Sequence, residues 1–247
     1  MSMGFYMFHP ADLLLIPAIL FALWAQARVR GAYAKYSKVG VRAGLTGADV
    51  ARFILRDQST SVAQAGGKAA LSEVVNLECI PGEMTDHYDP RDKTLRLSEG
   101  VYHGRSIAAL GIAAHEVGHA LQDADNYAPM QLRQLMYPAS SIGSTLAFPL
   151  IFGGLILGYM GYAVPWLITA GIWLFAAAVA FTIVTLPVEF NASRRALLAL
   201  ANGRYLTEEE LDGARAVLSA AALTYVAAAA AAILQLIRLI LISQRRN

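Results

Sequence analysis

The chain has 247 residues, of which 56% are hydrophobic, and its mean hydropathy is +0.45. This composition excludes an ordinary soluble domain and favours a protein with membrane-spanning segments. The net charge of +2 is small, and no basic run is interleaved with aromatic residues, so we expect no nucleic-acid partner. A single cysteine, Cys79, excludes an intramolecular disulfide and a CxxC motif.

The first apolar segment runs from Leu13 to about Ala27 and is predicted to be an N-terminal membrane anchor. No lysine or arginine precedes it, so the segment lacks the basic start of a cleaved signal peptide. Arg28 and Arg30 follow at once, which indicates an N-terminus outside the cell and a C-terminal end in the cytoplasm.

A long polar region follows the anchor. Thr46 and Asp49 form a variant of the capping box, which predicts a helix over Ala48–Asp57. The polar, glycine-containing stretch Gln58–Lys68 is typical of a loop. The next stretch, Leu71–Ile80, is rich in apolar residues and predicts a strand.

Two short segments, Thr85–Asp89 and Thr94–Ser98, flank a four-residue turn and predict a β-hairpin. Leu95 and Leu97 would lie on one face of it. A strand at the edge of a sheet can hold an extended peptide by adding it to the sheet. A plain structural hairpin explains the same pattern equally well.

The stretch Ser106–Asp125 contains the sequence HEVGH. Residues four apart share one face of a helix, so His115 and His119 would present two imidazoles to one zinc ion. Glu116 lies about 100° further around the helix, where it could take a proton from a water on the zinc. Small neighbours and Gly118 predict a buried helix that another backbone can approach. The alternative is a buried helix whose two histidines have only structural partners.

Three further apolar segments follow this motif. Residues 138–158 and 164–186 are uncharged and predict a membrane hairpin with a short link. Thr207 and Glu210 form a capping box that predicts a helix start, and this helix would run into the apolar segment 216–242. We expect the last segment to span the membrane, with burial inside the helix bundle as the alternative.

The basic residues orient these segments. Of the 20 lysines and arginines, 13 lie between the first and second segments and 4 between the third and fourth. None lies between the second and third segments. The positive-inside rule therefore places the HEVGH stretch and residues 187–215 together on the cytoplasmic side.

Two histidines leave a catalytic zinc site one protein ligand short. Glu189, at the predicted cytoplasmic end of the third segment, is the favoured third ligand. Asp125 is the rival, because it has the spacing of a metzincin ligand, but Gln122 stands where that motif needs glycine. The alternative to a ligand role is that Glu189 is an ordinary interfacial carboxylate paired with Arg194 or Arg195.

Four motifs in order resemble the YugP-type neutral zinc metallopeptidases of bacterial membranes. They are TDHYDPR at 85–91, LRLSEGVY at 95–102, AAHEVGHALQ at 113–122 and PVEFNASRRA at 187–196. The resemblance implies a gluzincin-like site with Zn²⁺ held by His115, His119 and Glu189, and with Glu116 as the general base. A more distant likeness is to the HtpX-type and CAAX-prenyl membrane proteases. Asn191 departs from the family pattern, which usually has aspartate there, and an acid at this position could orient a ligand histidine.

We therefore predict a mainly α integral membrane protein with about four transmembrane helices and a small α+β zincin-like (minigluzincin) catalytic domain. We expect it in the inner (plasma) membrane of bacteria, with its active site facing the cytoplasm and a peptide or protein as substrate. Oligomeric state and membrane protein partners are left open. The expected divisions are an anchor at 1–27, a catalytic region at 28–137, a membrane hairpin at 138–186, a third-ligand segment at 187–215 and an apolar helix at 216–247.

The predicted activity is zinc-dependent endopeptidase, with Glu116 activating a water. The donor that stabilises the oxyanion is left open among Tyr102, His103, Tyr127, Arg194 and Arg195. A metal-holding scaffold or chaperone-like protein is the alternative function. A metal transporter is disfavoured, because segments 138–158 and 164–186 contain no ionisable residue.

Overall fold

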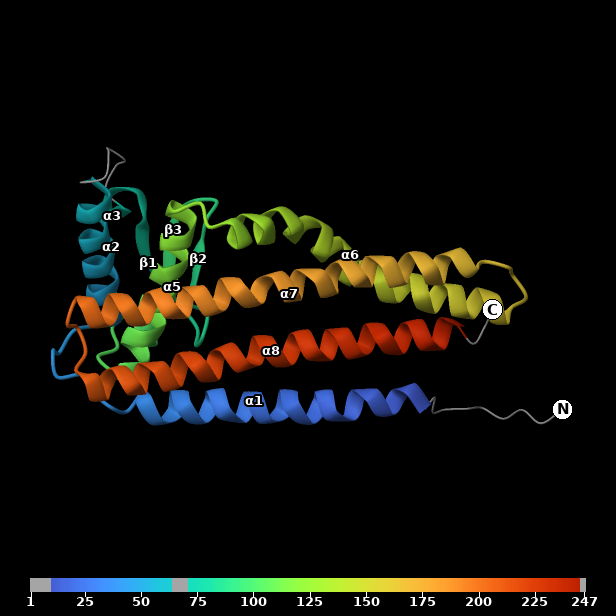
Figure 1. Cartoon of the computed structure of the whole chain (residues 1–247), viewed down its shortest axis with the longest axis horizontal. Helices are drawn as coiled ribbons and strands as arrows, with labels where there is room; N and C mark the ends of the chain where they lie inside the picture. The colour runs from blue at the N-terminus through green and yellow to red at the C-terminus, as the bar shows by residue number, and fades with distance from the viewer. Residues whose placement is uncertain (1–9, 64–70, 245–247) are drawn as a thin grey trace. The chain divides into compact units, whose positions relative to one another are not determined.

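The computed structural model describes residues 10–63 and 71–244, and Figure 1 shows their arrangement. These residues are mostly helical, with one small three-stranded sheet, as the sequence predicts. The elements are η1 (Pro10–Leu14), α1 (Leu15–Tyr36), α2 (Gly47–Ala63), α3 (Leu71–Val74), β1 (Asn76–Ile80), β2 (His87–Asp89), β3 (Thr94–Ser98), α4 (Glu99–Tyr102), α5 (Ile107–Ala124), α6 (Ala128–Tyr159), α7 (Pro165–Asn202) and α8 (Glu208–Gln244).

The chain forms two compact units, and each unit is discontinuous in sequence. The first unit contains Met1–Gln26, Leu132–Leu186 and Thr224–Asn247. The second unit contains Ala27–Gln131 and Pro187–Leu223, so it joins the polar region around HEVGH to the segment that carries Glu189.

Four helices in the described residues are long and apolar enough to cross a membrane: η1 with α1, α6, α7 and α8. All four extend beyond the predicted apolar segments. The α7 helix continues through Pro187 to Asn202, because the loss of one backbone donor at a proline is tolerated where neighbouring groups replace it. The α6 helix begins at Ala128, well before residue 138, and contains two prolines.

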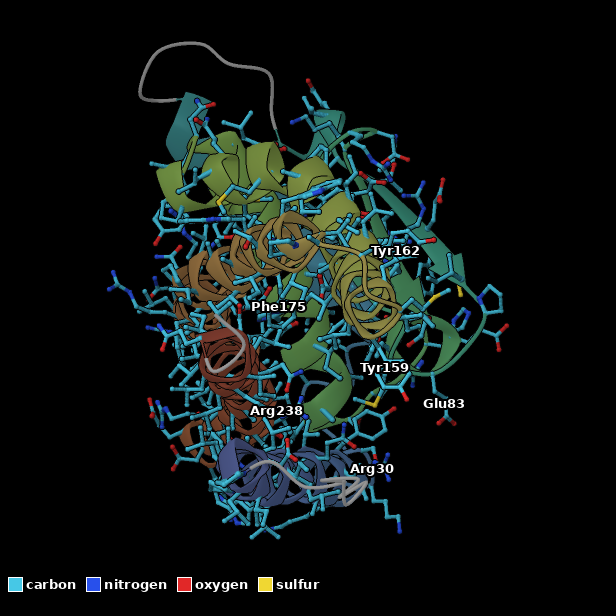
Figure 2. The ribbon with its side chains drawn as sticks, turned by 90° about the vertical axis from the view of Figure 1, so that its right-hand side faces the viewer. Arg30, Glu83, Tyr159, Tyr162, Phe175 and Arg238 are labelled. Carbon is cyan, nitrogen blue, oxygen red and sulfur yellow. The ribbon has the colours of Figure 1, made fainter. Side chains whose placement is uncertain are left out.

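Small residues bring the helices of the first unit together. A Cβ added at Gly143 would lie 2.6 Å from the carbonyl oxygen of Leu174, and one at Gly171 would lie 2.7 Å from that of Ala147. The α6 and α7 helices therefore approach so closely that only glycine fits, as is common between membrane helices. In the same unit, Arg238 donates a hydrogen bond of 2.5 Å to Asp12 (Figure 2).

The sheet of the second unit has the strand order β1-β3-β2. The hairpin is confirmed: β2 pairs antiparallel with β3, although β2 begins at His87 rather than Thr85. The strand predicted over Leu71–Ile80 is wrong in its first part, where α3 forms instead. The strand β1 is limited to the five residues that have a partner, because each of them pairs in parallel with one of the five residues of β3.

Both predicted capping boxes are confirmed by reciprocal hydrogen bonds. The Thr46 amide donates to Asp49 Oδ2 at 3.0 Å, and the Asp49 amide donates to Thr46 Oγ1 at 3.1 Å. The Thr207 amide donates to Glu210 Oε2 at 2.8 Å, and α8 begins at the next residue.

The end of α2 differs from the prediction. The helix continues to Ala63, so the loop predicted from Gln58 is wrong for its first residues. Serine, threonine and glutamine lower helix propensity only slightly, and no glycine or proline interrupts this part. The remaining residues of that predicted loop, 64–68, lie outside the described part of the chain.

The α5 helix forms the centre of the second unit, and most of its residues are buried. Its N-cap residue Ser106 accepts a hydrogen bond from the Ala109 amide at 3.2 Å. The side chains of Leu95 and Leu97 on β3 are fully buried in the same core. The α5 helix thus holds the HEVGH sequence inside the folded unit (Figure 1).

Candidate metal centre

Three side chains that could hold a metal ion converge in the second unit. His115 and His119 lie on α5, with ring centroids 4.8 Å apart. Glu189 lies on α7, and its Oε2 atom is 3.3 Å from His115 Nε2 and 3.6 Å from His119 Nε2. One ligand atom from each of the three residues lies within 4.8 Å of the other two. The structure therefore brings together the three residues that the sequence predicts as ligands.

Close packing of α5 against α7 positions this cluster. A Cβ added at Gly118 would lie only 2.5 Å from the carbonyl oxygen of Ala192, so glycine lets the two backbones approach. The continuation of α7 beyond Leu186 keeps Glu189 on a helix, one turn from Ala192. Val188 and Ala192 are fully buried beside it.

A polar partner faces the second ring nitrogen of each histidine. His119 Nδ1 lies 3.0 Å from Gln122 Oε1, and His115 Nδ1 lies 3.1 Å from Ser193 Oγ. Such partners fix the rotation of an imidazole and leave Nε2 directed at the cluster. The sequence pattern did not indicate these partner roles, although Gln122 lies three residues after His119 and on the same helical face.

Glu116 is buried and lies outside the cluster of three. Burial raises the pKa of its carboxyl to about 7, while His115 lowers that pKa and Glu189 raises it. A buried carboxyl with a perturbed pKa beside such a cluster is a candidate for proton transfer.

The rival third ligand has another partner. Asp125 caps the C-terminal end of α5 and forms an ion pair with Arg195. The Arg195 guanidinium also donates to Asn191 Oδ1 at 2.8 Å. Asn191 therefore contacts Arg195 and, through a 3.0 Å bond, Gln122, so its contact with His119 is indirect.

Four of the five residues considered as oxyanion donors already have other contacts. The Tyr102 hydroxyl accepts a hydrogen bond from Arg52 at 2.8 Å, and the His103 ring packs edge-on against Tyr102. Arg195 stacks over the Tyr127 ring in addition to its polar contacts. These contacts do not select an oxyanion donor.

The donor set suits zinc. Two imidazole nitrogens and one carboxylate oxygen are the ligands of the His₂Glu class of catalytic zinc site, which keeps a further coordination position for substrate or water. A buried carboxylate next to such a set is typical of hydrolytic zinc enzymes. Together, fold and cluster are typical of a membrane metallopeptidase.

Comparison with known proteins agrees with this class. The chain belongs to the family described as "Putative neutral zinc metallopeptidase", which matches residues 11–244. It is similar to the "Putative membrane protease YugP" of Bacillus subtilis (strain 168), with 43% identity over 229 residues. The alignment covers 93% of this chain and 94% of that relative. No solved structure matches the chain.

Proposed function

We propose that this protein is a membrane-embedded zinc endopeptidase that hydrolyses peptide bonds at a cytoplasm-facing site. The observation that carries the proposal is the convergence of His115 Nε2, His119 Nε2 and Glu189 Oε2 on one point. The α5 helix, the small sheet and the end of α7 would form a zincin-like domain of the minigluzincin type around that point.

His115, His119 and Glu189 would hold the zinc ion. When bound, zinc supplies a Lewis acid that polarises the scissile carbonyl and makes a water more acidic. Glu116 accepts the proton of the attacking water and then delivers it to the leaving amine. Gln122 and Ser193 hold the two imidazoles in the rotation that this arrangement needs.

The distribution of basic residues supports the cytoplasmic orientation. The second unit contains both polar regions in which lysine and arginine concentrate. Regions of this kind stay on the cytoplasmic side of bacterial membranes. The substrate would therefore be a peptide segment that reaches the cytoplasmic face of the inner membrane.

The experiment compares the wild-type protein with Glu116→Gln, both purified in detergent and loaded with zinc. Cleavage of a mixture of fluorogenic peptides is measured together with zinc content. We expect the variant to keep its zinc and to lose activity by roughly 10²–10⁴-fold, because only the proton acceptor is removed. Stoichiometric zinc without any wild-type turnover would instead favour the metal-holding scaffold, and equal cleavage by both proteins would contradict the role of Glu116.

A further inference from the structure

We propose that Gln122 is a positioning residue, which fixes His119 for metal binding and connects it to the helix that carries Glu189. This inference rests on the proposed function and assigns to Gln122 a role in the zinc site. Gln122 lies on α5 and its side chain is fully buried, with 0% exposure. A buried amide must satisfy both its donor and its acceptor, so its contacts are informative.

The surroundings determine which way the Gln122 amide points. Its nitrogen lies 2.8 Å from the Val188 carbonyl oxygen, a group that can only accept a hydrogen bond. The same nitrogen lies 3.0 Å from Asn191 Oδ1. The amide oxygen is therefore the atom that faces His119 Nδ1 at 3.0 Å. An oxygen there can only accept, so His119 must carry its proton on Nδ1.

This arrangement leaves His119 Nε2 with a lone pair for a cation. An imidazole with its proton on Nδ1 can coordinate a metal only through Nε2, the atom that faces Glu189. Gln122 thus selects the form of His119 that the proposed zinc site requires.

The donor side of Gln122 connects α5 to α7. Both of its acceptors, Val188 and Asn191, lie on α7, immediately before and shortly after Glu189. One buried side chain therefore contacts a ligand on one helix and holds the backbone next to a ligand on the other. Removing it would break both bonds to α7 and leave the buried Nδ1–H donor of His119 without its acceptor, which is costly in a protein interior.

Asn191 has a supporting part in this arrangement. Its Oδ1 atom accepts from Gln122 and from Arg195 Nε, and Arg195 in turn pairs with Asp125 at the end of α5. Both donors need only an oxygen at this position. An aspartate would offer the same oxygen, and Asn191→Asp is expected to leave zinc affinity within about threefold of wild type.

The test measures zinc affinity by competition with a chelator in Gln122→Met, Gln122→Glu and Gln131→Met. Methionine is similar in length to glutamine but offers His119 no acceptor, so we expect zinc to bind about 10–100-fold more weakly. Glutamate retains an acceptor for His119 but loses the donor to Val188 and Asn191, so its zinc affinity is expected to lie between those of the wild type and the methionine variant. Gln131, which bonds to Asn126 on the surface, gives the matched control and is expected to bind zinc as the wild type does.

A second readout reports the hydrogen bond itself. In zinc-loaded protein with ¹⁵N-labelled histidine, His119 should show a Nδ1–H signal that is protected from solvent exchange. Gln122→Met should lose that protection, whereas Ser193→Ala should lose only the signal of His115. Asn191→Leu, which keeps Gln122 itself, should weaken the protection of the His119 signal and provides a test if Gln122→Met does not fold.

The outcomes separate this inference from the proposed function. If the wild type binds zinc but Gln122→Met and Gln122→Glu lose affinity equally, with the His119 signal unchanged, Gln122 acts through packing and the inference is wrong. Zinc affinity in Gln122→Met equal to that of Gln131→Met would also overturn it. A wild type that binds no zinc would overturn both the inference and the proposed function.

Discussion

At the scale of single residues, Glu189 and Asp125 have different partners, and our proposal for the class of metal site depends on this difference. Glu189 is buried against the nitrogen atoms of both histidines. Asp125 is about half exposed and pairs with Arg195. A metzincin would need its chain to turn near Gln122, but α5 continues through that position to Ala124. The contacts therefore favour the gluzincin type of ligand set.

We predict that Glu189→Ala loses zinc and activity together, because it leaves only two imidazoles to hold the ion. Asp125→Ala is expected to retain stoichiometric zinc, since it removes an exposed ion pair whose contribution to the free energy of unfolding is at most about 1 kcal/mol. Zinc content and peptide cleavage are measured on both variants, with circular dichroism in detergent as a check of folding. A filled site in Glu189→Ala and an empty one in Asp125→Ala would establish the metzincin type instead.

The sequence predicted the members of this cluster but not their partners. The spacing of His115 and His119 follows from helix geometry, and Glu189 follows from the placement of one acid beside a membrane segment. Gln122 and Ser193 could not be assigned in this way, because their roles depend on how closely α5 and α7 approach. That distance is set by packing between residues far apart in the sequence.

At the scale of elements, two glycines of α5 meet different neighbours. A Cβ at Gly118 would lie 2.5 Å from a backbone oxygen of α7, whereas a Cβ at Gly111 would lie 3.5 Å from the Ala214 side chain, an ordinary contact distance. Both positions are buried on the same helix, so they form a matched pair for testing how α5 and α7 are held together.

We predict opposite effects of alanine at these two positions. Gly118→Ala forces α7 away from α5, and overpacking of this kind costs about 1–3 kcal/mol, more than the roughly 1 kcal/mol that alanine gains in helix propensity. Gly111→Ala keeps the gain in propensity without the clash and should leave stability equal or higher. Thermal unfolding in detergent measures both, and zinc affinity should fall only in Gly118→Ala. A stabilised Gly118→Ala with normal zinc affinity would contradict this packing.

The starts of α2 and α8 were predictable from the sequence, whereas the start of α6 and the ends of α2 and α7 were not. The starts of α2 and α8 are marked by capping boxes, which act through residues three apart. The predicted boundaries at Gln58 and Leu186 both fall inside helices. Both helices continue past the predicted boundaries because no breaking residue follows for α2, and because Pro187 is accommodated within α7.

At the scale of the whole molecule, contacts at both ends relate α8 to α1. In the first unit, Arg238 near the end of α8 pairs with Asp12, just before α1. In the second unit, Gly213 near the start of α8 packs against Tyr36 at the end of α1, because a Cβ added at Gly213 would lie 2.8 Å from the Tyr36 ring. Within each unit α8 thus contacts α1 or the residues just before it, and we predict that both helices span the membrane.

We predict a topology in which the link between α6 and α7 is external. Tyr159 is the last residue of α6 and Tyr162 lies in the link, and both are exposed, as aromatic residues at a membrane–water interface are (Figure 2). Reporters fused after Gly161 and after Asn247 should read as external, and one fused after Arg204 as cytoplasmic. External activity after Arg204 would place the metal cluster outside the cell, and a cytoplasmic reading after Asn247 would show that α8 does not span.

The central claim is that this protein holds one zinc ion between α5 and α7, and metal content tests it most directly. Elemental analysis of the purified wild type should find about one zinc per chain. His115→Ala and His119→Ala should each reduce zinc to background while remaining folded in detergent, because each variant removes one of three ligands. Stoichiometric zinc in both variants, or its absence from a folded wild type, would contradict the account.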